Sequence, residues 1–163
     1  MIRHKISDEA VAFRATGCFC VVRGHVLLTQ RAAHKPLGLH WGIPTGKIES
    51  GETPRQCMVR ELGEEIGLTS TPGALSEIAS YLVGEGSTAF EYVAFALLLE
   101  EVPLLHLAPD EVRARAWMPV REVQQRPVVP YFYNTLNDLL DWLEHGKVTL
   151  SPLPQAEANK PRS

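Results

Sequence analysis

The segment from Thr53 to Gly67 constrains the fold most, because it carries both a start signal and a stop signal for one helix. Thr53 is a suitable N-cap, Pro54 occupies the first helical position, and Gln56 completes a Thr-x-x-Gln capping box. Apolar residues then recur at helical spacing, and Gly67 follows the last of them as a C-terminal stop. The sequence therefore predicts a helix over Pro54–Ile66 that packs on the rest of the protein by one face.

Three glutamates on this predicted helix lie where their charges would destabilise an isolated helix. Glu61, Glu64 and Glu65 stand at i, i+3 and i+4, so their carboxylates share one face. Each like-charged pair costs roughly 0.2–0.5 kcal/mol, and the helix dipole disfavours negative charge near the C-terminus. Arg60 balances only one of them. A hard divalent cation such as Mg²⁺ would compensate the rest, although the cluster by itself favours a solvated acidic face.

A longer pattern around the glutamates favours the metal. Gly46, five residues, Glu52, seven residues and then the run Arg60-Glu61-Leu62-Gly63-Glu64-Glu65-Ile66-Gly67-Leu68 match G-x5-E-x7-R-E-U-x-E-E-x-G-U, where U is aliphatic. So many fixed positions rarely coincide by chance. On this box the chain resembles the Nudix hydrolases. The resemblance implies an α/β fold, an α/β/α sandwich with a mixed sheet and a loop-helix-loop, and cleavage of the pyrophosphate linkage of a nucleoside diphosphate joined to another group.

The likeness continues outside the box. Leu27–Arg31 looks like the family's strand before the substrate loop, Trp41–Lys47 resembles its W-x-x-P-G-G-K stretch, and Arg115–Val120 resembles its late strand. It spans roughly Ala15 to Val123. The chain departs at Thr45, where many members have glycine, and this departure matters little if the backbone carbonyl there is the ligand.

The resemblance also implies the metal ligands and their neighbours. Glu61, Glu64 and Glu65 would hold one to three Mg²⁺ ions, with Mn²⁺ as a substitute. A backbone carbonyl of Thr45 or Gly46 would help. Around them, Arg60 would orient Glu61 and pair with Glu52, and Lys47 would meet phosphate as a point charge. Further candidates for substrate contact precede the box: Arg31, His34 and His40.

The general base has two candidate sources. Glu64 or Glu65 would accept the proton of a metal-bound water, or a loop before the late strand would supply Asp110 or Glu111. Glu111 is the preferred loop candidate. The thiol of Cys57 offers no alternative nucleophile, because no histidine lies nearby in the sequence to activate it.

The substrate is inferred by elimination. Gly84 stands where an ADP-ribose-type proline is expected, and Tyr81 lies too early for the dinucleotide class. We therefore favour (deoxy)nucleoside triphosphates, cleaved to a monophosphate and pyrophosphate, with ADP-ribose and nucleotide sugars left open. Aromatic side chains that are candidates to stack on a base, or to pack in the core, are Trp41, Phe90 and Tyr92.

Two other functions fit the same box less well. A nucleotide-sensing Nudix domain commonly lacks box carboxylates, all of which stand here. An isoprenoid diphosphate isomerase needs a dedicated cysteine and a longer N-terminal region. Hydrolysis is the leading hypothesis.

Composition sets the remaining expectations. A net charge of -3 gives no basic footprint for a nucleic-acid polymer, and no apolar run is long enough to span a membrane. Three cysteines without framework spacing favour free thiols and a cytoplasmic location. We expect one domain over residues 1–150 and a disordered tail over 151–163, and the apolar ends leave a homodimer open.

Other expected elements are two strands within Thr16–Gln30 joined by a tight turn at Arg23-Gly24-His25, strands over Ile78–Val83, Phe90–Leu99 and Arg115–Met118, a loop over His106–Ala114, and a helix over Asn134–His145.

Overall fold

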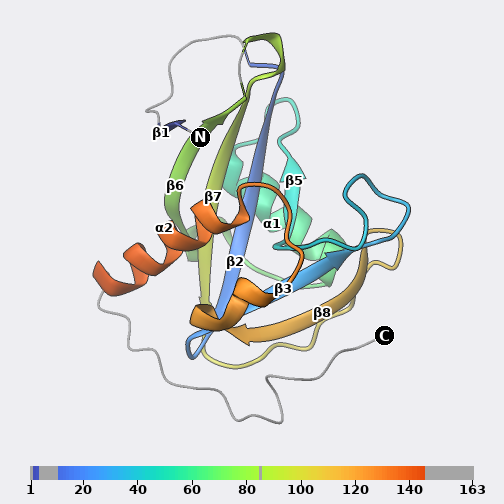
Figure 1. Cartoon of the computed structure of the whole chain (residues 1–163), viewed down its shortest axis with the longest axis vertical. Helices are drawn as coiled ribbons and strands as arrows, with labels where there is room; N and C mark the ends of the chain where they lie inside the picture. Colours follow the sequence, from blue (N-terminus) through green and yellow to red (C-terminus); the bar gives the residue numbers. More distant parts are fainter. Residues whose placement is uncertain (1, 4–10, 85, 146–163) are drawn as a thin grey trace.

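The computed structural model describes residues 2–3, 11–84 and 86–145 (Figure 1), so the tail expected from residue 151 lies outside the described residues. The strands are β1 (Ile2–Arg3), β2 (Phe13–Val22), β3 (His25–Arg31), β4 (Trp41–Gly42), β5 (Thr45–Lys47), β6 (Leu75–Val83), β7 (Phe90–Leu99) and β8 (Val112–Pro119). The α-helices are α1 (Pro54–Ile66) and α2 (Phe132–His145), and short 3₁₀ turns cover Pro72–Ala74, Gly86–Thr88 and Val120–Gln125.

The strands form one mixed sheet that divides along β2. The order is β1-β6-β7-β2-β3-β4, with β5 added on β2 and β8 on β3. β2 and β7 run parallel over their whole length, whereas the other pairs are antiparallel. β2 pairs with β3 only at the hairpin end, and its first half pairs with β5 instead. This division lets the segment before α1 join the sheet beside β2, on the side opposite β7.

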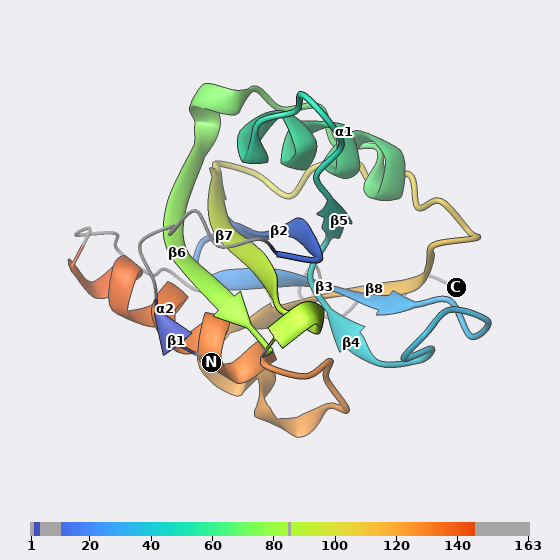
Figure 2. The same cartoon turned by 90° about the horizontal axis from the view of Figure 1, so that it is seen from above.

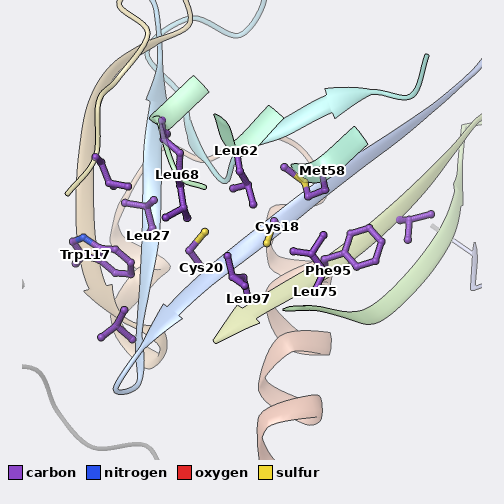
Figure 3. Close-up of a cluster of buried hydrophobic side chains, with 14 residues drawn as sticks. Cys18, Cys20, Leu27, Met58, Leu62, Leu68, Leu75, Phe95, Leu97 and Trp117 are labelled. Carbon is purple, nitrogen blue, oxygen red and sulfur yellow. The ribbon is translucent and has the colours of Figure 1, made fainter. Parts of the chain in front are cut away.

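The two α-helices lie on opposite sides of the sheet, as Figure 2 shows. Side chains alternate along β2, so Cys18 and Cys20 face α1 while Phe19 and Val21 face α2. Between the sheet and α1, Met58 packs in the buried cluster drawn in Figure 3. The expected α/β/α sandwich with a mixed sheet is confirmed, and Cys18 and Cys20 pack in the core.

The best-marked element of the sequence forms as predicted. α1 runs from Pro54 to Ile66, and both bonds of the capping box join Thr53 and Gln56. Gly67 ends the helix in the left-handed region with φ of 66°, where a side chain would be strained. The tight turn of the β2–β3 hairpin also forms, with positive φ at Arg23 and Gly24.

Several boundaries differ from the sequence prediction. β2 begins at Phe13 rather than Thr16, and β6 begins at Leu75 rather than Ile78. β8 begins at Val112 rather than Arg115, because antiparallel pairing with β3 continues across an irregularity after Gln30. α2 begins at Phe132, two residues before Asn134, since its first turn buries an aromatic ring. The stretch Trp41–Lys47, for which no strand was predicted, contains the short strands β4 and β5. Across the described residues, no helix is both long and apolar enough to cross a membrane.

Candidate active site

Arg60 connects the two halves of the box through its guanidinium group. Its Nε and Nη2 donate to the two Glu52 carboxylate oxygens at 2.9 and 3.1 Å. Its Nη1 donates to Glu61 at 2.7 Å and to Glu64 at 3.2 Å. The hydrogen bonds that Arg60 donates to Glu52 lower the pKa of the Glu52 carboxyl group. Arg60 therefore holds the loop before α1 against the carboxylates of the helix, in the arrangement that the sequence predicted.

The Glu61 side chain lies directly on the backbone of Gly46. A Cβ added at Gly46 would stand 2.1 Å from the Glu61 carboxyl carbon. The absence of a side chain at Gly46 therefore allows the Glu61 carboxylate to rest on β5. This contact gives a physical reason for the glycine that opens the box.

Glu65 is the most confined of the three glutamates. Burial, the largest cause, acts together with the charges of Glu61 and Glu111 to raise its pKa to about 8, against the opposing effect of a hydrogen bond from the Thr45 backbone. Burial also raises the pKa of Glu61. Burial thus disfavours the charged form of both inner carboxylates.

Glu64 differs from the other two in exposure, with 63% of its side chain accessible. Within the described residues, no three carboxylate, imidazole or thiol groups already stand at metal-ligand spacing. Instead of grouping around a metal site, the carboxylates of Glu61 and Glu64 accept hydrogen bonds from Arg60. The donors available on this face are nonetheless carboxylate and carbonyl oxygens, which are the ligands that Mg²⁺ prefers.

The C-terminal end of α1 fixes the loop that carries Glu111. The amides of His106 and Ala108 donate to the carbonyls of Ile66 and Glu65, both at 2.8 Å. On the other side, the Ala32 amide donates to the Glu111 carbonyl at 3.0 Å. The loop thereby satisfies carbonyls that a helix end leaves free, and it brings Glu111 to the glutamate face.

A cavity of about 610 Å³ joins these groups. Its lining combines acidic side chains, basic side chains and an apolar, aromatic surface. The charged lining residues are Arg31, Lys35, Lys47, Glu61, Glu64, Glu65 and Glu111. The aromatic ones are Phe13, Phe90, Tyr92, Tyr131 and Phe132.

The aromatic lining comes largely from the first halves of β2 and β7. The rings of Phe13 and Phe90 stack at a centroid distance of 4.5 Å and an interplanar angle of 10°. The Lys47 ammonium lies 4.6 Å from the centroid of the Phe13 ring. The aromatic surface and a basic group that could meet phosphate are therefore adjacent.

The structure separates the sequence candidates. It brings Arg31, Lys47, Phe90 and Tyr92 to the cavity, whereas His34, His40, Asp110 and Trp41 do not line it. Trp41 is a core residue under the Arg126 guanidinium instead. Burial raises the pKa of the Cys57 thiol to about 12, in keeping with its exclusion as a nucleophile. Sequence reasoning missed Phe13, Lys35 and Tyr131, for which the sequence offers no spacing signal.

Gly46→Ala is expected to lower kcat about tenfold or more, because the new Cβ displaces the Glu61 carboxylate from β5. Gly63→Ala is the matched control, since a Cβ there meets no atom within 4 Å. That control is expected to keep its activity and to gain up to about 1 kcal/mol in stability from helix propensity. Steady-state kinetics and thermal unfolding of both variants test this, and an active Gly46→Ala variant would refute the contact's importance.

The metal-free protein is expected to lose stability as the pH rises from about 4.5 to about 8. The folded-state pKa of Glu65 lies above its unfolded value, so folding favours the protonated acid and its contribution disappears above pH 8. Glu52 contributes with the opposite sign, since its pKa is lowered. In EDTA, Glu65→Gln should reduce the change in the free energy of unfolding between pH 4.5 and pH 8 by on the order of a few kcal/mol. The same pH dependence of unfolding in the wild-type protein and in Glu65→Gln would contradict a raised pKa for Glu65.

The comparisons with known proteins agree with this geometry. The model of the NUDIX domain family matches residues 12–142. The uncharacterized Nudix hydrolase YvcI of Bacillus subtilis is 28% identical over 142 residues, which cover 85% of this chain and 87% of the relative. A CTP pyrophosphohydrolase of Escherichia coli K12 is 33% identical over 109 residues, covering 66% and 76%. The solution structure of the E. coli ORF135 protein superposes with a TM-score of 0.69 at 23% identity, covering 89% and 99%. The chain thus belongs to the NUDIX domain family and is a Nudix pyrophosphohydrolase.

Proposed function

We propose that this hydrolase is Mg²⁺-dependent and cleaves (deoxy)nucleoside triphosphates to a nucleoside monophosphate and pyrophosphate. The observation that carries the proposal is the shared cavity, in which a face of glutamates and the basic side chains of Arg31 and Lys47 meet an aromatic surface. A nucleoside triphosphate needs both environments side by side, the charged groups for its triphosphate and the aromatic surface for its nucleobase.

Glu61, Glu64 and Glu65 are the proposed carboxylate ligands, with Mn²⁺ as a substitute for Mg²⁺. When bound, the metal supplies charge neutralisation of the diphosphate and a lowered pKa for its water. Binding requires Glu64 to leave Arg60, and its exposure leaves it free to turn. The cation would also stabilise the charged forms of Glu61 and Glu65, which burial disfavours.

The β2–β5 ladder favours Thr45 over Gly46 as the backbone ligand. The bonds Cys18 N to Pro44 O and Ile48 N to Arg14 O flank this short ladder. Their alternation makes Thr16 and Gly46 a hydrogen-bonded pair, so the Gly46 carbonyl points to β2. The Thr45 carbonyl points away from β2 and remains available.

The other side chains bind, orient and accept a proton. Arg31 and Lys47 line the cavity and would hold phosphate oxygens. Glu111 is the proposed general base, which accepts a proton from the attacking water at its carboxylate. Arg60 and Glu52 would act through Glu61 by fixing its orientation.

Triphosphates are favoured over other nucleotides by the relatives with the stronger matches. The names of two of them, the CTP pyrophosphohydrolase of E. coli and an 8-oxo-dGTP diphosphatase of Proteus vulgaris, specify triphosphates, and the second is 37% identical over 74 residues. That match covers 45% of this chain and 66% of the relative. ADP-ribose and nucleotide sugars are the alternative substrates. A cytoplasmic location belongs to the same proposal and is supported by three free cysteines.

The test is a product screen with Mg²⁺ over nucleoside triphosphates, ADP-ribose, dinucleoside polyphosphates and nucleotide sugars. The highest kcat/KM is expected for a triphosphate. A higher value for another class would move the substrate assignment to that class. No turnover together with measurable nucleotide binding would instead favour the sensor function, and size-exclusion chromatography of the same sample tests the homodimer.

A further inference from the structure

Lys35 forms an ion pair at the cavity that no sequence pattern indicates. Its Nζ lies 2.5 Å from Oε1 of Glu111, although the two residues are 76 positions apart. Both residues line the cavity that the box glutamates also line. The contact therefore joins the loop before the box to the loop before β8 at the cavity.

The backbone on both sides of this ion pair is fixed. The Ala32 amide donates to the Glu111 carbonyl at 3.0 Å, and the Lys35 amide donates to the Ala32 carbonyl at 3.1 Å. The Arg31 Nε donates to the Pro36 carbonyl at 2.9 Å. Lys35 thus reaches Glu111 from a loop that is bonded both to itself and to the loop of its partner.

The charges around Glu111 explain why it needs this partner. Glu61 and Glu65 on α1 face it closely enough that its charge raises the pKa of each. Arg31 is a nearby cation from β3, and it lowers the pKa of Glu65. Glu111 is 44% exposed, so repulsion from the two glutamates would turn an unpaired carboxylate toward solvent. The Lys35 ammonium opposes that repulsion.

We propose that Lys35 is a positioning residue, which holds the Glu111 carboxylate at the cavity opposite the box glutamates so that it can accept the proton of the attacking water. The role rests on the proposed function. Lys35 acts through Glu111 in this scheme and contacts neither phosphate nor base.

The test is a double-mutant cycle in kcat with Lys35→Met and Glu111→Gln. Lys35→Met is expected to lower kcat about tenfold and to leave KM within about twofold, while Glu111→Gln lowers kcat roughly 100-fold. The double variant should be no slower than Glu111→Gln alone, because Lys35 then has nothing to position. Lys35→Arg should recover most of the rate, and Arg121→Met, on an exposed ion pair with Glu144, serves as the control.

A metal-free readout tests the ion pair itself. Lys35→Met should lower Tm by about 1–3 °C in EDTA, and the same substitution should lower Tm by less in the Glu111→Gln background, where the ion pair is already absent. Two results would overturn the role of Lys35 while the proposed function stands. One is a raised KM with unchanged kcat in Lys35→Met, and the other is a kcat loss in the double variant that equals the two single losses combined. An inactive wild-type protein would overturn the proposed function and this role together.

Discussion

Glu64→Gln is expected to lower kcat at least about 100-fold while Tm in EDTA stays within about 2 °C. Even groups that only orient a metal ligand are worth 10–100-fold, so the loss of a ligand should cost more. The fold should tolerate the change, because the side chain is 63% exposed and accepts a hydrogen bond from Arg60 at its surface. Steady-state kinetics with Mg²⁺ and thermal unfolding measure the two effects.

Glu144→Gln on α2 is the matched control for this variant. Glu144 is also an exposed helical glutamate paired with an arginine, with 56% of its side chain accessible. It lies outside the cavity lining, so its removal should leave kcat unchanged. A near wild-type rate for Glu64→Gln would remove Glu64 from the proposed metal site.

Arg60→Met is expected to reduce both stability and activity. The substitution leaves Glu52 and Glu61, both largely buried, without their shared counter-charge. Removal of one partner of a fully buried pair costs 3–5 kcal/mol. Because the Arg60 side chain is 25% exposed, we expect about 1–3 kcal/mol in the free energy of unfolding. The rate should fall about 10–100-fold, since Glu61 loses its orientation.

Denaturant unfolding and steady-state kinetics of Arg60→Met test both effects against Arg121→Met. Arg121 pairs with Glu144 at an exposed site, so its loss should cost less than about 1 kcal/mol and no activity. Equal stability losses in the two variants would show that the box ion pairs are no stronger than surface ones. An unchanged rate for Arg60→Met would contradict the positioning of Glu61.

Local signals explain why α1 and its glutamates were predictable from the sequence. The cap at Thr53, the stop at Gly67 and the box spacing all lie within one short stretch of chain. A helix places residues three and four apart on one face, so the glutamate face follows from sequence spacing alone. The pairing of Arg60 with Glu52 also followed, because both belong to the same pattern.

Contacts between distant segments explain what the sequence could not supply. Phe13 meets Phe90 only because β2 and β7 pair in parallel, and Lys35 meets Glu111 only because two loops join at the end of α1. The start of β8 at Val112 likewise depends on its pairing with β3. Such features require the register of the sheet, which local patterns do not encode.

The central claim is tested most directly by resolving the products that the wild-type protein forms from a deoxynucleoside triphosphate with millimolar Mg²⁺ and with excess EDTA. We predict a monophosphate and pyrophosphate with Mg²⁺, and no turnover in EDTA. A rate that EDTA leaves unchanged, or release of a diphosphate and orthophosphate, would contradict the proposed site and reaction.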